Sequence, residues 1–391
     1  MNRCCHAVAG VCRLLVRLLG RVGKLRWLSA VHALILLVAT YLVWNLPYDF
    51  TGEGVSFLQY WHLAKSHVTE DDAVPEELYL VNTCYDHTMV PVRDALDIEC
   101  GTIDITDREK LLTLMRALKQ ENDYRYIVCD ISLNKQYVTP ADSALFSLMQ
   151  TMDRCMVADL DNVELPLQLK ALGVRSEYGI SISNNNFLKY QYMQDGTPSM
   201  ALQMATEMDG VSFTQKGLFY FLDGKLCNNA HIVDFRTCIR NEYNSNLVKN
   251  ILQLGTDVLP QIDAGCRGMF KDKIVMIGDF FENDIHSTIA GELSGCVITY
   301  NAYLALKAHE NEVPFLLMAF LCIAYFYLTL LILRGNDDAY KSSAKWLKWA
   351  VQISVPVLFI AFGAYMQTLL FLIYYQFFRW AVALGRKFIT R

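Results

Sequence analysis

The sequence predicts an α/β domain, with a mixed or mostly parallel sheet flanked by helices, carried between transmembrane helices. Two observations lead to this fold class. Long stretches without a charged side chain lie near both ends of the 391-residue chain, in which 53% of the residues are hydrophobic. Between them, short apolar runs alternate with helical patterns. Strands that alternate with helices are typical of domains built on a largely parallel sheet.

The first two uncharged stretches are each long enough for one membrane span. A helix that crosses the bilayer core needs about 20 apolar residues. Residues 28–46 are predicted to form a transmembrane signal anchor, and residues 314–333 to form a second span. A cleaved signal peptide is the alternative for the first stretch, but no small-x-small cleavage site follows it, which favours a retained anchor.

Basic residues give the predicted orientation. Residues 1–27 contain six Arg or Lys residues and no acid, and residues 334–348 are also rich in Lys. Positively charged flanks stay in the cytoplasm. The sequence therefore predicts a cytoplasmic N-terminus, a cytoplasmic loop over residues 334–348, and an outer domain over residues 47–313.

The N-terminal arm, residues 1–27, has a helical charge pattern. Its basic residues recur every three or four positions, at Arg13, Arg17, Arg21 and Lys24. This spacing indicates a basic amphipathic helix lying on the anionic inner leaflet of the lipid bilayer. A specific partner helix is the alternative.

The third stretch, residues 349–378, fits neither one span nor two. Its 30 uncharged residues exceed one span and fall short of the roughly 40 residues that two would need. The basic tail, residues 379–391, favours the cytoplasm and hence two short spans that turn near Gly363. The sequence leaves the total at three or four spans.

The outer domain contains recognisable strands and helices. Its predicted strands are short apolar runs at residues 77–82, 126–131, 154–159, 219–222, 231–235 and 273–278. Its predicted helices repeat apolar residues at helical spacing, at residues 106–119, 141–152, 199–208 and 295–306. Continuous apolar runs are typical of strands that are covered on both faces.

Cysteine spacing suggests two bridged loops. Cys84 with Cys100, and Cys227 with Cys238, are near enough in sequence to pair, and an oxidising compartment would permit disulfides. The alternative is that they are thiols, which behave as small hydrophobes when buried.

Candidates for chemistry are few. Asp279, Glu282, Asp284 and His286 follow the strand at 273–278, and strand ends are where α/β proteins gather ligand sites. This group either holds a metal ion or forms a solvated loop, and no second His follows at helical spacing. A glycine-rich phosphate loop and a basic, aromatic patch are both missing from the sequence. We therefore predict no enzymatic activity, no cofactor or metal, and no nucleic-acid partner.

The segment FKDKIVMIGDFFENDIHSTIAGELSGCVITYNAYLAL, residues 270–306, carries a more specific pattern. It has a KIVxIG strand, a loop with Asp and Thr, a Gly turn and an Asn-Ala helix. It resembles the C-terminal signature of the type-2 CHASE domain, an extracellular sensory domain associated with cyclases and histidine kinases. The residues that match are Gly278, Asp284, Thr288, Gly295 and Asn301.

This resemblance implies a sensory function. The protein is expected to be a bacterial inner-membrane receptor whose periplasmic domain binds an envelope ligand or protein. The five matching residues would form a ligand or transmission motif; a fold-maintaining turn is the alternative. The few residues after Arg379 cannot fold into a kinase or cyclase, so we expect the signal to pass to a separate protein partner in the membrane or cytoplasm.

Two other functions and one question of assembly stay open. The domain is alternatively a structural scaffold subunit of an envelope complex, which would only offer a docking surface. It is alternatively an extracytoplasmic hydrolase that uses the loop of Asp284 and His286. The sequence leaves open whether the chain forms a homo-oligomer.

Overall fold

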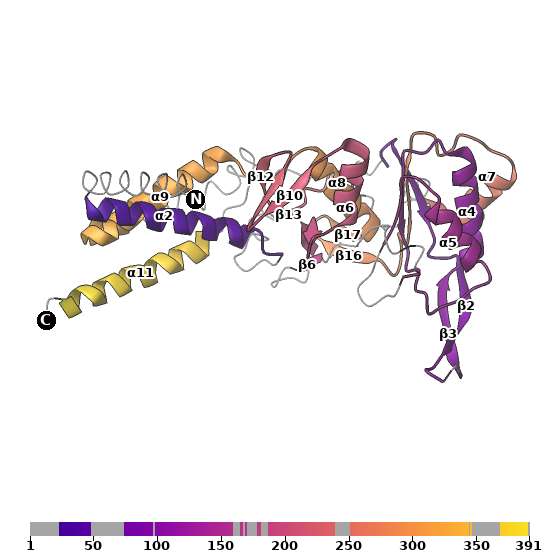
Figure 1. The fold of residues 1–391 in the computed structure, drawn as a ribbon, viewed down its shortest axis with the longest axis horizontal. Helices are drawn as coiled ribbons and strands as arrows, with labels where there is room; N and C mark the ends of the chain where they lie inside the picture. Colours follow the sequence, from indigo (N-terminus) through magenta and orange to yellow (C-terminus); the bar gives the residue numbers. More distant parts are fainter. Residues whose placement is uncertain are drawn as a thin grey trace, which may run out of the picture. The chain divides into compact units, whose positions relative to one another are not determined.

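The computed structural model describes residues 23–47, 74–96, 98–158, 165–166, 169, 178–180, 187–238, 251–343, 345 and 368–389. The chain divides into a helical unit (Met1–Leu46, Phe50–Tyr60 and Glu312–Arg391) and an α/β unit (Pro47–Asp49 and Trp61–Asn311) (Figure 1). Residues 1–22 of the predicted arm, and residues 349–367 of the third apolar stretch, lie outside the described residues.

A five-stranded parallel sheet forms the centre of the α/β unit, which confirms the α/β part of the predicted fold class. Its order is β14-β1-β15-β4-β5. The strands are β1 (Leu78–Asn82), β4 (Tyr126–Asp130), β5 (Cys155–Val157), β14 (Ile251–Gln253) and β15 (Ile274–Gly278). The register pairs Gly278 with Asn82 on one side and with Asp130 on the other. The last residues of the three central strands therefore form one row at the carboxyl edge of the sheet.

Helices cover both faces of this sheet (Figure 1). The helices α4 (Arg108–Glu121), α5 (Asp142–Gln150) and α7 (Leu259–Asp263) share a buried apolar cluster with Val81, Ile127 and Val275. A short π-helix, η2 (Leu254–Val258), leads into α7. The helices α6 (Met200–Asp209) and α8 (Gly295–Lys307) pack together. Tyr126 contacts Glu207 of α6, and it points to the opposite face from Ile127 because strand side chains alternate.

The helices α4, α6 and α8 each begin at a capping side chain. Asp107 caps α4, since its side chain accepts hydrogen bonds from the backbone N–H groups of Glu109 and Lys110. Ser199 caps α6 and Ser294 caps α8 in the same way. Such caps satisfy donors that have no partner within the helix.

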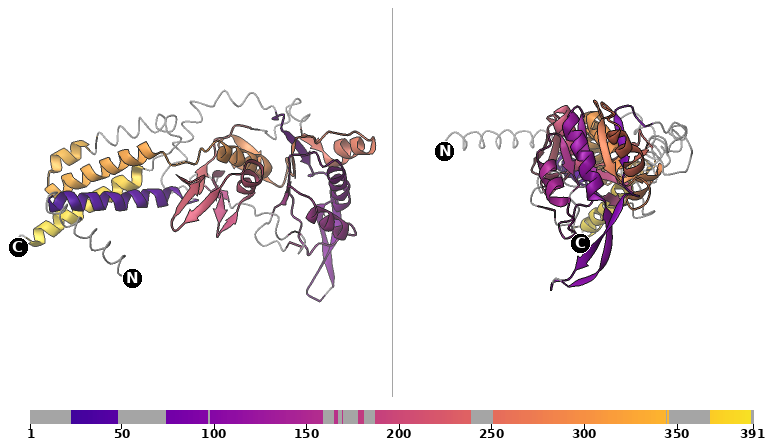
Figure 2. Two further views of the ribbon diagram at one scale, coloured as in Figure 1. Left: turned by 45° about the horizontal axis from the view of Figure 1, so that its top comes forward. Right: turned by 90° about the vertical axis from the view of Figure 1, so that its right-hand side faces the viewer.

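The remaining strands are mostly antiparallel, with one further parallel pair outside the central sheet (Figure 2). A hairpin consists of β2 (His87–Arg93) and β3 (Glu99–Thr106), and a second sheet consists of β10 (Phe213–Lys216), β11 (Phe219–Leu222) and β12 (Lys225–Cys227). A third contains β13 (Ala230–Ile232), β7 (Phe187–Gln191), β16 (Ile285–Thr288) and β17 (Gly291–Ser294), with β6 (Tyr178–Ile180) beside β7. The short strands β8 (Met193–Gln194) and β9 (Thr197–Pro198) pair with each other.

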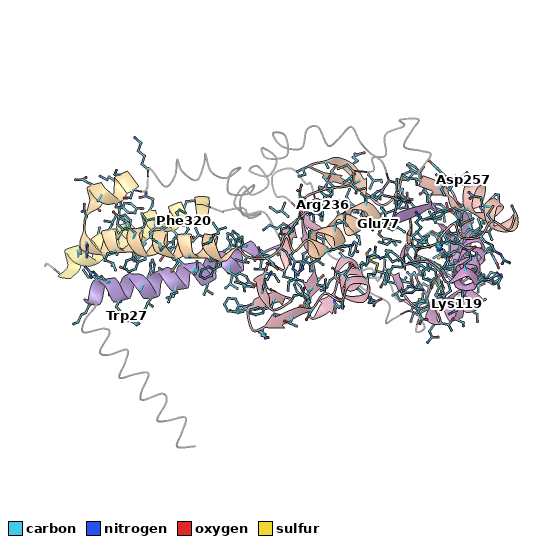
Figure 3. The ribbon with its side chains drawn as sticks, turned by 90° about the horizontal axis from the view of Figure 1, so that it is seen from above. Trp27, Glu77, Lys119, Arg236, Asp257 and Phe320 are labelled. Atoms are coloured by element: carbon cyan, nitrogen blue, oxygen red, sulfur yellow. The ribbon has the colours of Figure 1, made fainter. Side chains whose placement is uncertain are left out.

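Among the described residues, the helical unit contains two helices that are long and apolar enough to cross a membrane, α2 (Lys24–Trp44) and α9 (Phe315–Arg334). Their bounds lie close to the stretches predicted from the sequence, and the labels of Trp27 and Phe320 mark them in Figure 3. A third helix, α11 (Thr368–Ile389), runs without a break across the predicted start of the basic tail at residue 379. That tail is therefore helical as far as Ile389.

Polar side chains join these three helices within an otherwise apolar contact. The ring of His32 in α2 lies 2.8 Å from the Thr329 hydroxyl of α9 and 2.5 Å from the Tyr374 hydroxyl of α11. The Tyr375 hydroxyl donates to the backbone carbonyl of Tyr325 at 3.0 Å. At the end of α9, Arg386 donates to the backbone carbonyls of Ile332 at 2.9 Å and Leu333 at 3.0 Å.

Candidate functional site

The first turn of α8 is seated on the carboxyl edge of the parallel sheet. Gly278 ends β15, and a Cβ atom added there would lie 2.7 Å from Cys296 Sγ. The Cys296 thiol lies 3.7 Å from Asp130 Oδ2 at the end of β4. Both side chains are buried. Glycine at position 278 therefore lets α8 approach the sheet closely.

Asn82, at the end of β1, ties three segments together. Its Oδ1 atom accepts from the backbone N–H of Phe280 at 3.0 Å and of Cys84 at 3.3 Å. Its Nδ2 atom donates to Gln253 Oε1 at 2.7 Å. Sequence reasoning missed this residue, because a single Asn at the end of an apolar run gives no sign of its distant partners.

Of the four residues in the predicted acidic group, Asp279, Glu282 and Asp284 lie in a turn, and His286 lies in the hairpin that follows it. The strands β16 and β17 pair from Ile285 opposite Ser294 to Thr288 opposite Gly291. Asp279 accepts from three backbone N–H groups of the turn that precedes this hairpin. Among the described residues, no group of three His, Cys, Asp or Glu side chains could hold a metal ion.

Asp284 and Thr288 have different places in this hairpin. The backbone carbonyl of Asp284 accepts from Gly295 N at 3.0 Å, and its Oδ1 atom lies 3.0 Å from His286 Nε2. The Thr288 hydroxyl donates to Gly291 O at 2.7 Å and fixes the turn at the other end. The structure thus brings Asp284, Gly295 and Gly278 towards the start of α8 and leaves Thr288 at the far end of the hairpin.

Asn301 lies in the middle of α8 and is buried. Its Oδ1 atom accepts from the backbone N–H groups of Arg236 at 2.8 Å and Thr237 at 3.0 Å. Its Nδ2 atom donates to the carbonyls of Thr237 and Val297, both at 2.8 Å. These bonds hold the segment after β13 against the helix, which is a structural role.

The last turns of α8 are fixed by a second cluster, which we call the Arg125 cluster (Glu77, Arg125, Asp209, Tyr300 and Tyr303). Arg125 lies 3.2 Å from a Glu77 oxygen and 3.3 Å from an Asp209 oxygen. Glu77 lies at the amino end of β1 (Figure 3). Tyr303 donates to Asp209 at 2.7 Å, and Tyr300 donates to Glu77.

The tyrosines of this cluster remain neutral donors. Burial, followed by the hydrogen bond to Glu77, raises the pKa of Tyr300 well above its usual value. Burial and the bond to Asp209 raise the pKa of Tyr303 in the same way. A neutral phenol can donate to a carboxylate at any physiological pH, so α8 stays tied to β1 and α6.

Neither predicted disulfide is present. Cys84 is buried, Cys100 is exposed, and neither is in a disulfide. In the hairpin, Gly101 lies opposite Val92, which is five residues along β2 from His87. At the rise of a β-strand, Cys100 therefore lies roughly 17 Å from His87 along the hairpin. Cys84 precedes His87 at the other end of β2. A disulfide needs Cα atoms about 4.4–6.8 Å apart. Cys227 and Cys238 are both buried and are not disulfide-bonded.

Comparisons with known proteins give no relative. No protein-family model matches the chain, no curated protein matches it, and no solved structure matches it. The likeness of residues 270–306 to the type-2 CHASE signature therefore stays a prediction from the sequence.

Proposed function

We propose that the protein is a membrane-anchored receptor that senses an envelope ligand or protein. In this proposal its α/β unit lies outside the cytoplasmic membrane and acts through a separate protein partner. One observation carries the proposal. The helix α8 is fixed to the sheet at both ends, and the chain continues from it through residues 308–314 into the apolar helix α9.

The topology of the proposal rests on apolar length and on charge. α2 and α9 would both span the bilayer, since each is about one membrane thickness long. The basic residues before α2 favour a cytoplasmic N-terminus, which places the α/β unit outside. The likeness to the type-2 CHASE signature supports the same arrangement, and the total of three or four spans depends on residues 349–378.

Native cysteines test this topology. Cys100 and Cys266 are exposed on the α/β unit. A membrane-impermeant maleimide added to intact cells whose outer membrane has been permeabilised should label both residues, and mass spectrometry would identify them. Labelling only after the inner membrane is lysed would place the domain in the cytoplasm and end the proposal.

The receptor and scaffold functions differ in coupling and in partners. Affinity purification of the full-length protein from native membranes should recover a cytoplasmic kinase, cyclase or other output protein.

In parallel, Arg125→Ala should increase hydrogen exchange in α8 and also at residues 335–343, whereas Arg116→Ala, on an exposed position of α4, should not. Recovery of envelope proteins alone, with no change at residues 335–343, would favour a scaffold.

A further inference from the structure

One end of the helical unit carries a group of basic side chains, which we call the basic end (Arg334, Lys341, Lys345, Arg379 and Arg386). α9 ends there, a helical stretch follows at residues 337–343, and α11 passes the same place. Residues 334–345 and 379–386 together contain five basic and two acidic side chains. At the other end of α2 and α9, residues 42–47 are uncharged and residues 312–316 contain one acid and no base. The positive charge is therefore concentrated at one end of the helices.

The contacts of α11 bring its basic residues to the end of α9. Tyr375 donates to the backbone carbonyl of Tyr325 at 3.0 Å. About three turns later along α11, Arg386 donates to two carbonyls in the last turn of α9. Arg386 also lies against Gly335, where φ is +77° and an added Cβ atom would meet the guanidinium group. The two helices therefore run parallel, with their C-terminal ends side by side.

Arg379 is held at the basic end by an aromatic ring and not by an acid. Its guanidinium carbon lies 5.5 Å from the centre of the Tyr340 ring, and Tyr340 is buried in the apolar cluster of the helical unit. Lys341, the next residue, is exposed. Neither Arg379 nor Lys341 forms an ion pair with any described residue. A ring contact leaves the charge of a guanidinium group uncompensated, so these two side chains suit an anion.

Exposed apolar side chains lie next to these cations. On the outward side of α11, Phe377 and Trp380 are 67% and 65% exposed, and both lie within one turn of Arg379. Trp is enriched where membrane proteins meet the headgroup layer. A basic surface bordered by apolar side chains fits a molecule with an anionic head and a hydrocarbon tail. A soluble anion would use the charges and leave the apolar side chains in water.

We propose that the basic end binds an anionic phospholipid, whose phosphate contacts Arg379 and Lys341. Because Lys341 follows Tyr340 directly and Arg379 covers the Tyr340 ring, both cations border the same patch of surface. Basic pockets between membrane helices are known to bind such headgroups. The position of this patch in the cytoplasmic leaflet rests on the proposed function, whereas the binding of the lipid does not.

Native mass spectrometry of the full-length protein in detergent tests the binding. The probes are dioleoylphosphatidylglycerol, which is anionic, and dioleoylphosphatidylcholine, which has the same tails and no net charge. Each basic residue near a lipid surface contributes roughly five-fold in affinity. With two such residues, the Kd for phosphatidylglycerol should be about 25-fold lower than the Kd for phosphatidylcholine.

Three variants assign the binding to the patch. Arg379→Gln and Lys341→Gln should each raise the Kd for phosphatidylglycerol about five-fold. Lys341 is exposed, so its replacement leaves the packing of the helices unchanged even if Arg379→Gln disturbs the Tyr340 contact. The matched control is Arg26→Gln, which removes an exposed cation from the first turn of α2. It should change the Kd by less than about two-fold, because salt screens a distant exposed charge.

Equal binding of the two phospholipids would overturn the proposal. So would an equal loss in Arg26→Gln and in Lys341→Gln, since the attraction to the positive end would then be diffuse. Glycerol 3-phosphate carries the phosphate without tails and should not displace the lipid even in large excess; displacement would assign the patch to a soluble phosphate instead.

Failure of the receptor function has a different signature. Maleimide labelling that placed the α/β unit in the cytoplasm would end the receptor proposal and move the basic end to the opposite leaflet. Lipid binding measured in detergent would not change, because it does not depend on the orientation of the helices.

Discussion

Replacing Gly278 with alanine tests whether α8 is seated directly on the sheet edge. The added Cβ atom would lie 2.7 Å from Cys296 Sγ and 3.3 Å from the backbone oxygen of Asp130. Gly278 is not among the residues with positive φ, so the cost comes from these contacts and not from the backbone dihedral. Inserting a methyl group into a packed core costs about 1–3 kcal/mol. We expect Gly278→Ala to destabilise the α/β unit by that amount.

A second substitution assigns the cost to one contact. Cys296→Ala removes the sulfur and should by itself cost about 1 kcal/mol, as for other small deletions in a core. Since the two sites touch, the double variant should be at least about 1 kcal/mol more stable than the sum of the single changes. The rescue should be incomplete, because the Asp130 oxygen belongs to the backbone and stays in place.

Residues 74–311 contain no tryptophan whose fluorescence could report on unfolding. Hydrogen exchange followed by mass spectrometry is therefore the suitable assay. Exchange in peptides covering β15 and β4 should rise about 5-fold to 150-fold in Gly278→Ala. Gly385→Ala is the control, because a Cβ there meets nothing within 4 Å. Strictly additive effects of the two substitutions would refute the close approach of α8 to the sheet.

Three further predictions concern polar side chains that bridge segments or lie in the core. Arg108→Ala should lower the free energy of unfolding by about 3–5 kcal/mol, because Arg108 lies 2.6 Å from Asp142 and also donates to two backbone carbonyls. Hydrogen exchange in α4 would measure this loss. The exposed control Arg116→Ala should change the free energy of unfolding by less than about 0.5 kcal/mol. Burial lowers the pKa of His231 to about 4, so between pH 6.5 and 4 this side chain is protonated in the unfolded chain and neutral in the native state. The free energy of unfolding should therefore fall by up to about 3 kcal/mol as the pH falls from 6.5 to 4. His231→Gln should reduce this pH dependence, measured by denaturation followed by circular dichroism. His32→Leu removes two interhelical hydrogen bonds and should lower the free energy of unfolding of the helical unit by about 0.6–2 kcal/mol. Thermal unfolding followed by tryptophan fluorescence would measure this loss. An unchanged midpoint temperature would contradict the prediction.

Four strands of the central sheet were predicted because they are continuous apolar runs, whereas the edge strand β14 was missed. Burial on both sides demands a continuous apolar run, so β1, β4 and β15 could each be located from composition to within a residue or two. The start of α4 was equally clear, since an Asp before a periodic apolar segment is a capping signal.

The hairpins could not be predicted from such patterns. β2 contains Pro91, and β3 is mostly exposed, so neither strand needs an apolar run. β16 contains His286 and Ser287 and follows an acidic turn, and its composition is therefore that of a loop. Their strand pairing depends on tertiary contacts, which override the weak local preference for β structure.

The candidate sites were hidden for a different reason. The predicted motif lies on one continuous segment, whereas the Arg125 cluster joins residues from β1, α6 and α8 with the entry to β4. Charged residues scattered over such distances are individually ordinary in a sequence. Their proximity follows from the strand order β14-β1-β15-β4-β5, which local patterns do not determine.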